Sequence, residues 1–217
     1  MRLVVFDMDG TLIDSVALIV ETVAAAFEAT GEYVPDDRSI RSISGLTLDI
    51  ALQRLAPAAD LDRLVLLMDR YRSEYRARAG GREPLFPGAM AALDRLRADP
   101  DTALAVATGK GLKGARRLLA LHGIESYFSS VQTPDDNPSK PNPQMILSAI
   151  AAAGATARET VMIGDTNHDM EMARAAGVPA IGVAWGYHPP AELLAAGADL
   201  VLDQFDQLDA AIKTLLE

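Results

Sequence analysis

The sequence predicts an α/β fold, with a parallel sheet between two layers of helices and an all-helical insertion after the first strand. Three observations favour this fold. An apolar, β-prone run over residues 3–6 opens the chain, and helical periodicity alone follows over residues 15–82. From residue 89 onward, apolar strand-like runs alternate with helical ones. This alternation is typical of a Rossmann-like, three-layer core whose parallel strands are joined by right-handed crossovers.

The insertion carries two apolar stripes at the three- and four-residue spacings of a helix. The stripes consist of Val16, Ile19, Val20, Val23, Ala26 and Phe27, and of Leu61, Leu64, Met68, Tyr71 and Tyr75. Short helices over residues 39–43 and 47–55 would complete a small helical unit. The run 80–88 is rich in Gly and Pro and predicts a linker. We therefore expect a core domain of residues 1–14 and 83–217 and a helical domain of residues 15–82.

The second part of the core is expected to alternate regularly. The expected helices are 89–98, 112–122, 143–153 and 169–176, and the expected strands are 103–107, 127–131, 160–163, 180–184 and one near Leu200. Asn142 before Pro143 is a good helix start, and Gly177 after Ala176 is a good helix stop. In such sheets ligands bind outside the carboxyl ends of the strands.

Composition narrows the class of protein. The chain has 217 residues, is 49% hydrophobic and carries a formal net charge of -10. The acidic balance argues against a nucleic-acid or anionic-membrane partner, because both need an excess of Lys and Arg. With no cysteine, disulfides, thiolate catalysis and a Cys-based zinc site are excluded. Met1 and Arg2 lead directly into the first strand and no apolar run is long enough to span a bilayer, so we expect a cytoplasmic location. No feature predicts an oligomeric state.

Reactive side chains follow three of the predicted strands. Asp7 and Asp9 come directly after the first strand, where alternate side chains share a face, and Gly10 lets the backbone turn away. Thr108, Gly109 and Lys110 follow the second strand, and Asp165 and Asp169 follow the strand at 160–163. Because the carboxyl ends of parallel strands meet at one edge of the sheet, these groups are expected to share one crevice.

The residue types indicate phosphate chemistry at a metal site. Four carboxylates, those of Asp7, Asp9, Asp165 and Asp169, would repel one another unless a cation lay between them. An oxygen-only ligand set suits Mg²⁺, which is commonly held by carboxylates together with a substrate phosphate. One carboxylate of the first pair could attack and the other could move a proton.

Other residues of the expected crevice favour an anionic ligand. Thr108 offers a hydroxyl, and the glycine-rich segment from Gly109 opens a helix whose free N–H groups attract anions. Lys140 lies in a proline-rich loop that would hold its ammonium in a fixed position. In the insertion, Arg41 is followed by Gly45 in a predicted loop and is a candidate for contacting a substrate carboxylate or phosphate.

Two nucleotide-binding motifs are matched only in part. Residues 109–114 fit the dinucleotide pattern G-x-G-x-x-G, but Ser129 and Ser130 occupy the region where an acidic residue is expected at a strand end. The Walker pattern fails because Leu104 replaces its first glycine and Gly111 its Ser or Thr. A dinucleotide-binding oxidoreductase therefore remains an alternative, which titration with nicotinamide cofactors would test.

The ordered motifs resemble those of the haloacid dehalogenase superfamily, and within it the phosphatases with a helical cap after the first strand, similar to phosphoglycolate phosphatases. The resemblance covers essentially the whole chain. The matching motifs are Asp7-Met8-Asp9-Gly10-Thr11, then Thr108-Gly109, then Lys140, then Gly164-Asp165 with Asp169.

The resemblance implies a role for each matching residue. Asp7 would be the nucleophile and Asp9 the general acid and base. Thr108, Gly109 and Lys140 would bind the phosphoryl group. The implied Mg²⁺ site consists of Asp7, the backbone carbonyl of Asp9, Asp165 and Asp169, and the implied substrate-specificity loop contains Arg41 and Gly45.

The expected function is Mg²⁺-dependent hydrolysis of a small phosphorylated metabolite through an aspartyl phosphate, with 2-phosphoglycolate as the candidate substrate. A phosphomutase of the same family is an alternative, and it would release no free phosphate without a sugar acceptor. A receiver-like signalling module is another, because it also surrounds a phosphorylated aspartate with acidic residues, a Thr or Ser and a Lys. Such a module would take up phosphate once and stop.

Overall fold

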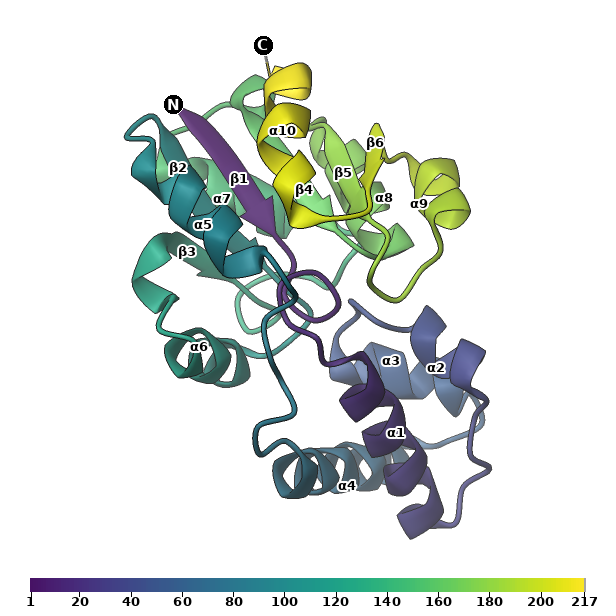
Figure 1. Ribbon diagram of the computed structural model, residues 1–217. Helices are drawn as coiled ribbons and strands as arrows, with labels where there is room; N and C mark the ends of the chain where they lie inside the picture. Colours follow the sequence, from purple (N-terminus) through teal and green to yellow (C-terminus); the bar gives the residue numbers. More distant parts are fainter. Residues whose placement is uncertain (217) are drawn as a thin grey trace.

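A six-stranded, entirely parallel sheet forms the centre of the computed structural model, which describes residues 1–216 (Figure 1). The strand order is β3-β2-β1-β4-β5-β6, so the first strand lies in the middle. The strands are β1 (Arg2–Phe6), β2 (Thr102–Ala107), β3 (Phe128–Gln132), β4 (Thr160–Gly164), β5 (Ala180–Val183) and β6 (Leu200–Leu202). The order reverses between β1 and β4, and a ligand site is expected at such a switch point.

Alternation along β1 divides the core into two layers. Val4 and Phe6 belong to the apolar cluster under α5, α6 and α10, whereas Leu3 and Val5 belong to the cluster under α7, α8 and α9. These helices are α5 (Ala89–Ala98), α6 (Leu112–Leu121), α7 (Gln144–Ala153), α8 (Asn167–Ala176), α9 (Pro190–Ala196) and α10 (Leu208–Leu216). Helices therefore cover both faces of the sheet, and the predicted three-layer α/β class is confirmed.

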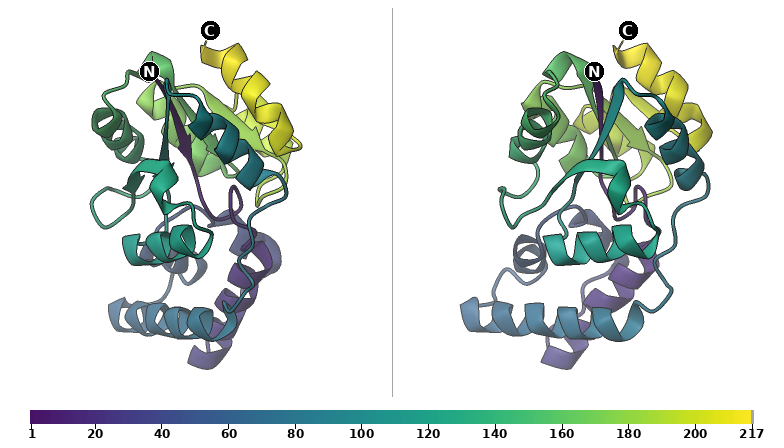
Figure 2. Two further views of the ribbon diagram at one scale, coloured as in Figure 1. Left: turned by 60° about the vertical axis from the view of Figure 1, so that its left-hand side comes forward. Right: turned by 90° about the vertical axis from the view of Figure 1, so that its left-hand side faces the viewer.

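Four helices between β1 and α5 form a separate layer, which we call the cap. They are α1 (Val16–Thr30), α2 (Asp37–Ser42), α3 (Leu48–Leu55) and α4 (Leu61–Arg78). The cap has its own apolar cluster, in which Val23, Phe27, Leu52 and Leu67 are almost fully buried. It lies beyond the carboxyl ends of the strands, facing the end of β1 (Figures 1 and 2). The predicted helical insertion is therefore confirmed.

The two chain crossings between core and cap run side by side. The Asp14 N–H donates to the Pro84 carbonyl at 2.8 Å, and the Phe86 N–H donates to the Leu12 carbonyl at 2.9 Å. The expected domain boundaries, after residue 14 and before residue 83, lie at this paired segment and stay a prediction. The cap is therefore joined to the core by two short, hydrogen-bonded linker segments.

The C-terminal region differs most from the expected pattern. Helices α9 and α10 were not predicted, and α8 begins at Asn167, two residues before its expected start. Helix α9 begins at Pro190, the last residue of a His-Pro-Pro sequence that indicates a turn, and it is only 7 residues long. Single 3₁₀ turns lie at Glu125–Tyr127, Ala157–Glu159 and Phe205–Gln207. None of the helices within residues 1–216 combines the length and apolar character needed to cross a membrane.

Candidate active site

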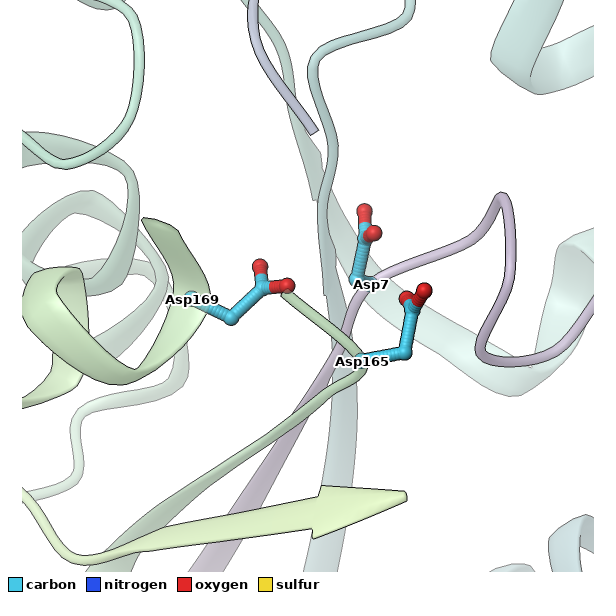
Figure 3. A group of neighbouring side chains, drawn as sticks. All are labelled: Asp7, Asp165 and Asp169. Atoms are coloured by element: carbon cyan, nitrogen blue, oxygen red, sulfur yellow. The ribbon is translucent and has the colours of Figure 1, made fainter. Parts of the chain in front are cut away.

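Three carboxylates from separate parts of the chain converge at the carboxyl end of the sheet. Asp7 follows β1, Asp165 follows β4, and Asp169 lies in the first turn of α8. Each offers an oxygen that lies within 4.8 Å of the others, and their carboxylates face a common space (Figure 3). The three residues are only 1%, 0% and 0% exposed, respectively. The chain therefore concentrates negative charge where water cannot screen it.

Lys140 supplies the only cation within salt-bridge distance of this group in the described part of the chain. Its Nζ lies 2.9 Å from Asp7 Oδ1 and 2.6 Å from Asp169 Oδ1. Burial opposes the charge of the ammonium, but the charges of Asp169 and Asp7 outweigh burial and raise the pKa of Lys140. Lys140 is therefore protonated at the site, as its predicted role in binding a phosphoryl group requires.

One cation does not compensate three buried carboxylates. Burial raises the pKa of Asp7 from 3.8 to about 7, against the lowering effect of Lys140 and with a further increase from Asp169. Burial also raises the pKa of Asp165 well above its ordinary value, and the charges of Asp7 and Asp169 add to this effect. Without another cation, the site therefore retains protons that it would lose in water.

Asp165 is held in place by donors that sequence reasoning missed. The Thr11 hydroxyl donates to Asp165 Oδ1 at 2.8 Å, and the Tyr187 N–H donates to Asp165 Oδ2 at 2.8 Å. Gly10 adopts a φ of 86°, and a Cβ at this position would lie 2.2 Å from Asp165 Oδ2. The glycine after the two aspartates is therefore needed both for the turn and for the close approach of Asp165.

Asp169 also caps its own helix. Its Oδ2 accepts hydrogen bonds from the Thr166 N–H at 3.0 Å and from the Thr166 hydroxyl at 2.7 Å, which completes a capping box with Thr166 as N-cap. The other oxygen, Oδ1, contacts Lys140. The Asp169 side chain therefore caps helix α8 with one oxygen and contributes the other to the acidic group.

The acidic group has the chemistry of a Mg²⁺ site. Apart from the ion pair with Lys140, both buried carboxylate oxygens of Asp7 have no hydrogen-bond partner among the described residues. Orphaned buried oxygens are costly, and a hard cation would satisfy them. Asp7, Asp165 and Asp169 offer only oxygen ligands, which fits Mg²⁺.

The Asp9 side chain points away from the acidic group, although Asp9 was expected to serve the metal. Its Oδ1 accepts a hydrogen bond from the Ser15 hydroxyl at 2.7 Å, and its Oδ2 lies 3.1 Å from Lys110 Nζ. The implied contribution of Asp9 to the metal through its backbone carbonyl stays a prediction. This geometry leaves the Asp9 carboxylate free for a role other than metal binding.

Lys110 links Asp9 to the cap and is the main site residue that sequence reasoning did not assign. Its Nζ donates to the Tyr75 hydroxyl at 3.2 Å and lies 4.7 Å from the centre of the Tyr75 ring. Tyr75 in turn donates to the buried Glu83. Burial opposes the charge of Lys110, but Asp9 outweighs it and raises the pKa of Lys110. Its position directly after Thr108-Gly109 at a strand end was the available signal.

A cavity of about 700 Å³ lies between core and cap, above the acidic group. Its lining includes Asp7, Asp9, Thr108, Gly109 and Gly45, five of the predicted site residues. Three further predicted residues, Lys140, Asp165 and Asp169, are buried in the same acidic group.

Arg41 is the predicted site residue that the structure does not bring to the cavity. It does not line the cavity, and its Nε donates to Asp37 Oδ2 at 2.8 Å on the exposed side of α2. Asp37 lies four residues earlier, at the spacing of an intrahelical ion pair. The proposed contact of Arg41 with a substrate carboxylate has no support in this arrangement.

Gly109 allows the cap to approach the core closely. A Cβ at Gly109 would lie 2.5 Å from the carbonyl oxygens of both Gly45 and Leu46 in the cap. Gly111, the second glycine of the apparent dinucleotide pattern, is less constrained, because a Cβ there would lie 3.6 Å from Asp135 Oδ1, an ordinary contact distance. The first glycine of that pattern therefore has a structural purpose unrelated to a dinucleotide.

The histidines make contacts outside the acidic group. His122 Nε2 lies 2.8 Å from the Glu83 carbonyl oxygen, and His188 Nδ1 accepts a hydrogen bond from the Asn167 N–H at 3.1 Å. His168 stacks edge-on against His188, and burial lowers the pKa of His168.

The fold and the site together define a class of capped α/β proteins with a group of buried aspartates at the carboxyl end of the sheet. The family model of haloacid dehalogenase-like hydrolases matches residues 4–183. The chain belongs to this family, and the resemblance noted in the sequence is confirmed.

Similar proteins bear phosphatase names. The chain is 38% identical over 220 residues to "Probable phosphatase IndB" of Dickeya dadantii, covering 99% of this chain and 95% of that protein. It is 32% identical over 220 residues to a phosphoglycolate phosphatase of Agrobacterium fabrum, covering 97% and 91%, respectively. The crystal structure of a hydrolase from Pseudomonas syringae superposes with a TM-score of 0.89 at 26% identity and full coverage of both chains. The expected enzyme class, a phosphoric monoester hydrolase, is confirmed at the level of the family.

The raised pKa values predict how stability depends on pH and Mg²⁺. Asp7 has a pKa of about 7 in the folded chain and 3.8 as its ordinary value, so the folded state binds more protons between these limits. In metal-free protein, this group therefore stabilises the fold below about pH 4, and its contribution is lost as the pH rises through about 7. Mg²⁺ should raise the melting temperature more at pH 8 than at pH 5, because it binds the ionised carboxylates. Thermal denaturation followed by circular dichroism measures both effects.

Substitution of the carboxylates provides the control for this prediction. Asp165→Asn should reduce the stabilisation by Mg²⁺, and Asp7→Asn should also flatten the pH dependence of the melting temperature. Asp136→Asn, in an exposed loop, should change neither. An equal Mg²⁺ effect in wild type and in both site variants would contradict the assignment of the metal site.

Gly109→Ala is expected to displace the cap loop rather than destabilise the sheet. The added Cβ would meet two backbone carbonyls, which cannot rotate away as a flexible side chain can. A displacement of about 1 Å at a reaction centre can lower turnover about 10²-fold. We expect a loss of this order in kcat/KM, with a native circular dichroism spectrum.

Gly111→Ala is the matched control, because its Cβ would make only ordinary van der Waals contact. It should retain nearly full activity. Equal activity of the two variants would show that the close approach at Gly109 is not needed for catalysis.

Proposed function

We propose that the protein is a Mg²⁺-dependent phosphatase that hydrolyses a small organic phosphate monoester through an aspartyl phosphate on Asp7. The observation that carries this proposal is the pairing of Asp7 with Lys140 at 2.9 Å below the cavity, with two further carboxylates beside it. The names of similar proteins support the same reaction and make 2-phosphoglycolate the first compound to test.

Asp7 is suited to be the nucleophile. Its carboxylate borders the cavity, and apart from the ion pair of Oδ1 with Lys140 its oxygens have no hydrogen-bond partner among the described residues that would have to be displaced before attack. Attack on phosphorus forms an Asp7–phosphorus bond while the bond from phosphorus to the alcohol oxygen breaks. This divides a difficult hydrolysis into two easier steps. Bound Mg²⁺ would supply positive charge that reduces the repulsion between the carboxylate and the dianionic phosphate.

Thr108 and Lys140 are suited to hold the transferred phosphoryl group. Thr108 is almost fully buried, and its hydroxyl lies at the cavity lining within reach of the Lys110 N–H, from which it accepts a hydrogen bond at 3.2 Å. Lys140 carries a buried positive charge beside Asp7. A positioned ammonium stabilises the charge that develops on the phosphoryl oxygens.

Asp9 is suited to move the proton. It is two residues from Asp7, borders the same cavity and is oriented by Ser15 and Lys110. In the first step it would protonate the departing alcohol oxygen. In the second it would take a proton from the water that attacks the phosphorus of the aspartyl phosphate.

Release of inorganic phosphate tests the proposed function. Wild-type protein with Mg²⁺ should release phosphate over many turnovers from 2-phosphoglycolate or other small esters, without an added acceptor. Asp7→Asn should abolish release, because an amide is not a competent nucleophile at phosphorus. Phosphate uptake that stops after one equivalent would favour a receiver-like module, and dependence on a sugar acceptor would favour a phosphomutase.

Asp9→Asn is expected to affect the two half-reactions differently. It keeps the shape of the side chain but removes the proton needed by an alkoxide leaving group. Phosphorylation of Asp7 by 4-nitrophenyl phosphate should survive better than phosphorylation by an alkyl phosphate, because nitrophenolate leaves without protonation. Loss of the general base should slow hydrolysis of the aspartyl phosphate about 10²–10⁴-fold.

A rapid-mixing experiment with Asp9→Asn should therefore show a burst of nitrophenol about equal to the enzyme concentration, followed by slow turnover. Wild type serves as the reference and should show no such slow second phase. An equal loss with both ester types and no burst would return the Asp9 carboxylate to a structural role.

Lys110→Met should lower turnover by removing the charge that orients Asp9. Lys110 also contacts Tyr75 of the cap. The substitution should therefore both misplace the proton donor Asp9 and weaken the attachment of the cap to the core. We expect kcat to fall about 10-fold or more with a smaller change in KM. Arg116→Met is the matched control, because Arg116 lies in the helix α6 that follows Lys110, is exposed and does not line the cavity; it should change kcat little. A rise in KM alone would assign Lys110 to substrate binding instead.

A further inference from the structure

The cap side of the cavity is built mainly of apolar side chains. Helices α1, α3 and α4 contribute Ile19, Val23, Leu48, Leu52 and Met68 to its lining. These side chains face the phosphate-handling residues of the core across the same cavity. The leaving alcohol of a bound phosphate ester would therefore lie against a hydrocarbon surface.

Aromatic rings complete this surface. Tyr71 and Tyr75 lie one turn apart on α4, with ring centres 6.0 Å apart, and Tyr187 of the core is 5% exposed. All three line the cavity. Aromatic side chains of this kind bind flat, apolar groups through their faces and edges.

Three buried hydroxyls of cavity-lining residues make no hydrogen bond to a described residue, those of Ser44, Thr47 and Tyr187, and the first two belong to the cap. Ser44 and Thr47 are 6% and 8% exposed, and neither hydroxyl makes a hydrogen bond to a described residue. Thr47 is the N-cap of α3 but makes no side-chain capping bond, unlike Asp36 and Asp60 at the starts of α2 and α4. Unsatisfied buried polar groups are costly, so these hydroxyls indicate a ligand site rather than a packed interior.

The cations at the cavity are arranged for entry of an anion. Arg72 and Arg76 of α4 and Lys113 and Arg117 of α6 line the cavity and are exposed, so they form its outer edge. Helix α6 lies above α4 in both views of Figure 2. In a chain of net charge -10, this basic edge would attract a phosphate dianion from solution. The fifth cation of the lining, Lys110, is paired with Asp9 at 3.1 Å and donates to the Tyr75 hydroxyl, so it is already engaged and is not offered to a substrate carboxylate.

The size of the cavity also exceeds the need of a two-carbon acid. Cavities of roughly 300–1,000 Å³ accommodate drug-sized ligands, and this one measures about 700 Å³. We infer that the preferred substrate is a phosphate monoester of an apolar, ring-bearing alcohol rather than 2-phosphoglycolate. This inference rests on the proposed phosphatase function and specifies its substrate class.

A set of primary alkyl esters tests the inference, because their alcohols leave with similar difficulty. Phosphate release is measured from benzyl phosphate, ethyl phosphate and 2-phosphoglycolate under identical conditions with Mg²⁺. Each methylene bound in an apolar pocket changes kcat/KM about 10–200-fold. Benzyl phosphate should therefore exceed both other esters at least about 10-fold in kcat/KM.

Met68→Ala tests whether the cap wall causes this preference. It should lower kcat/KM for benzyl phosphate about 10-fold and leave ethyl phosphate nearly unchanged. Leu66→Ala is the matched control, because Leu66 lies on the same helix but lines a different cavity, at the outer side of the cap. It should alter neither rate. Circular dichroism spectra identify any variant that does not fold, in which case the wild-type comparison decides.

The outcomes separate this inference from the proposed function. Phosphate release that is equal for the three esters, or fastest with 2-phosphoglycolate, would overturn the substrate class and leave the phosphatase intact. A benzyl preference that Met68→Ala leaves unchanged in a folded variant would overturn the role of the cap wall. Absence of phosphate release from every ester, 4-nitrophenyl phosphate included, would overturn both proposals.

Discussion

Repulsion among buried carboxylates is the constraint on which the rest of the structure depends. Asp7, Asp165 and Asp169 are held together out of water, with Lys140 as the one nearby ammonium in the described chain. Uncompensated buried charge costs several kcal/mol, in the range of roughly 3–5 kcal/mol when one partner of a buried pair is lost. The fold accepts this cost because parallel pairing of β1 with β4 brings both strand ends to one point. A cation bound between these carboxylates would lower this cost, so metal binding and the stability of the site would be coupled.

Core and cap divide the work by the kind of surface that each presents. The core contributes charge, with Asp7, Asp9, Thr108 and Lys140 at or behind the floor of the cavity. The cap contributes mainly hydrocarbon and aromatic rings from its own helices, with Arg72 and Arg76 at the outer edge. Lys110 joins the two parts, since it pairs with Asp9 below and contacts an aromatic ring of the cap above. Under the proposed function, the residues at the strand ends would determine the type of reaction, and the helices of the cap would discriminate among alcohols.

Much of this site could be predicted because its residues stand at strand ends. Asp7 and Asp165 were found from apolar runs that end in carboxylates, and parallel topology then required them to meet. The parts that were missed depend on contacts between distant segments. Tyr187 lies 22 residues from Asp165 and donates through its backbone, which leaves no trace in side-chain chemistry. Arg41 was assigned from its residue type and its spacing to Gly45, although Asp37 at i−4 was a signal that the guanidinium would be paired on its own helix. Local sequence patterns therefore predicted the chemical type of the site residues better than they predicted which side chains contact one another.

The paired chain crossings have a consequence for how such a protein changes over evolutionary time. Because the Asp14 N–H bonds to the Pro84 carbonyl, the inserted segment begins and ends at adjacent points. An exchange of everything between these points for another helical segment would leave β1, the aspartates and the sheet order untouched. Gly109 limits which segments would fit, because a new segment would have to pack against it as closely as Gly45 and Leu46 do. Recombination at two neighbouring positions could therefore replace one inserted segment by another. A glycine at position 109 would still be required wherever the new segment packs as closely against the core.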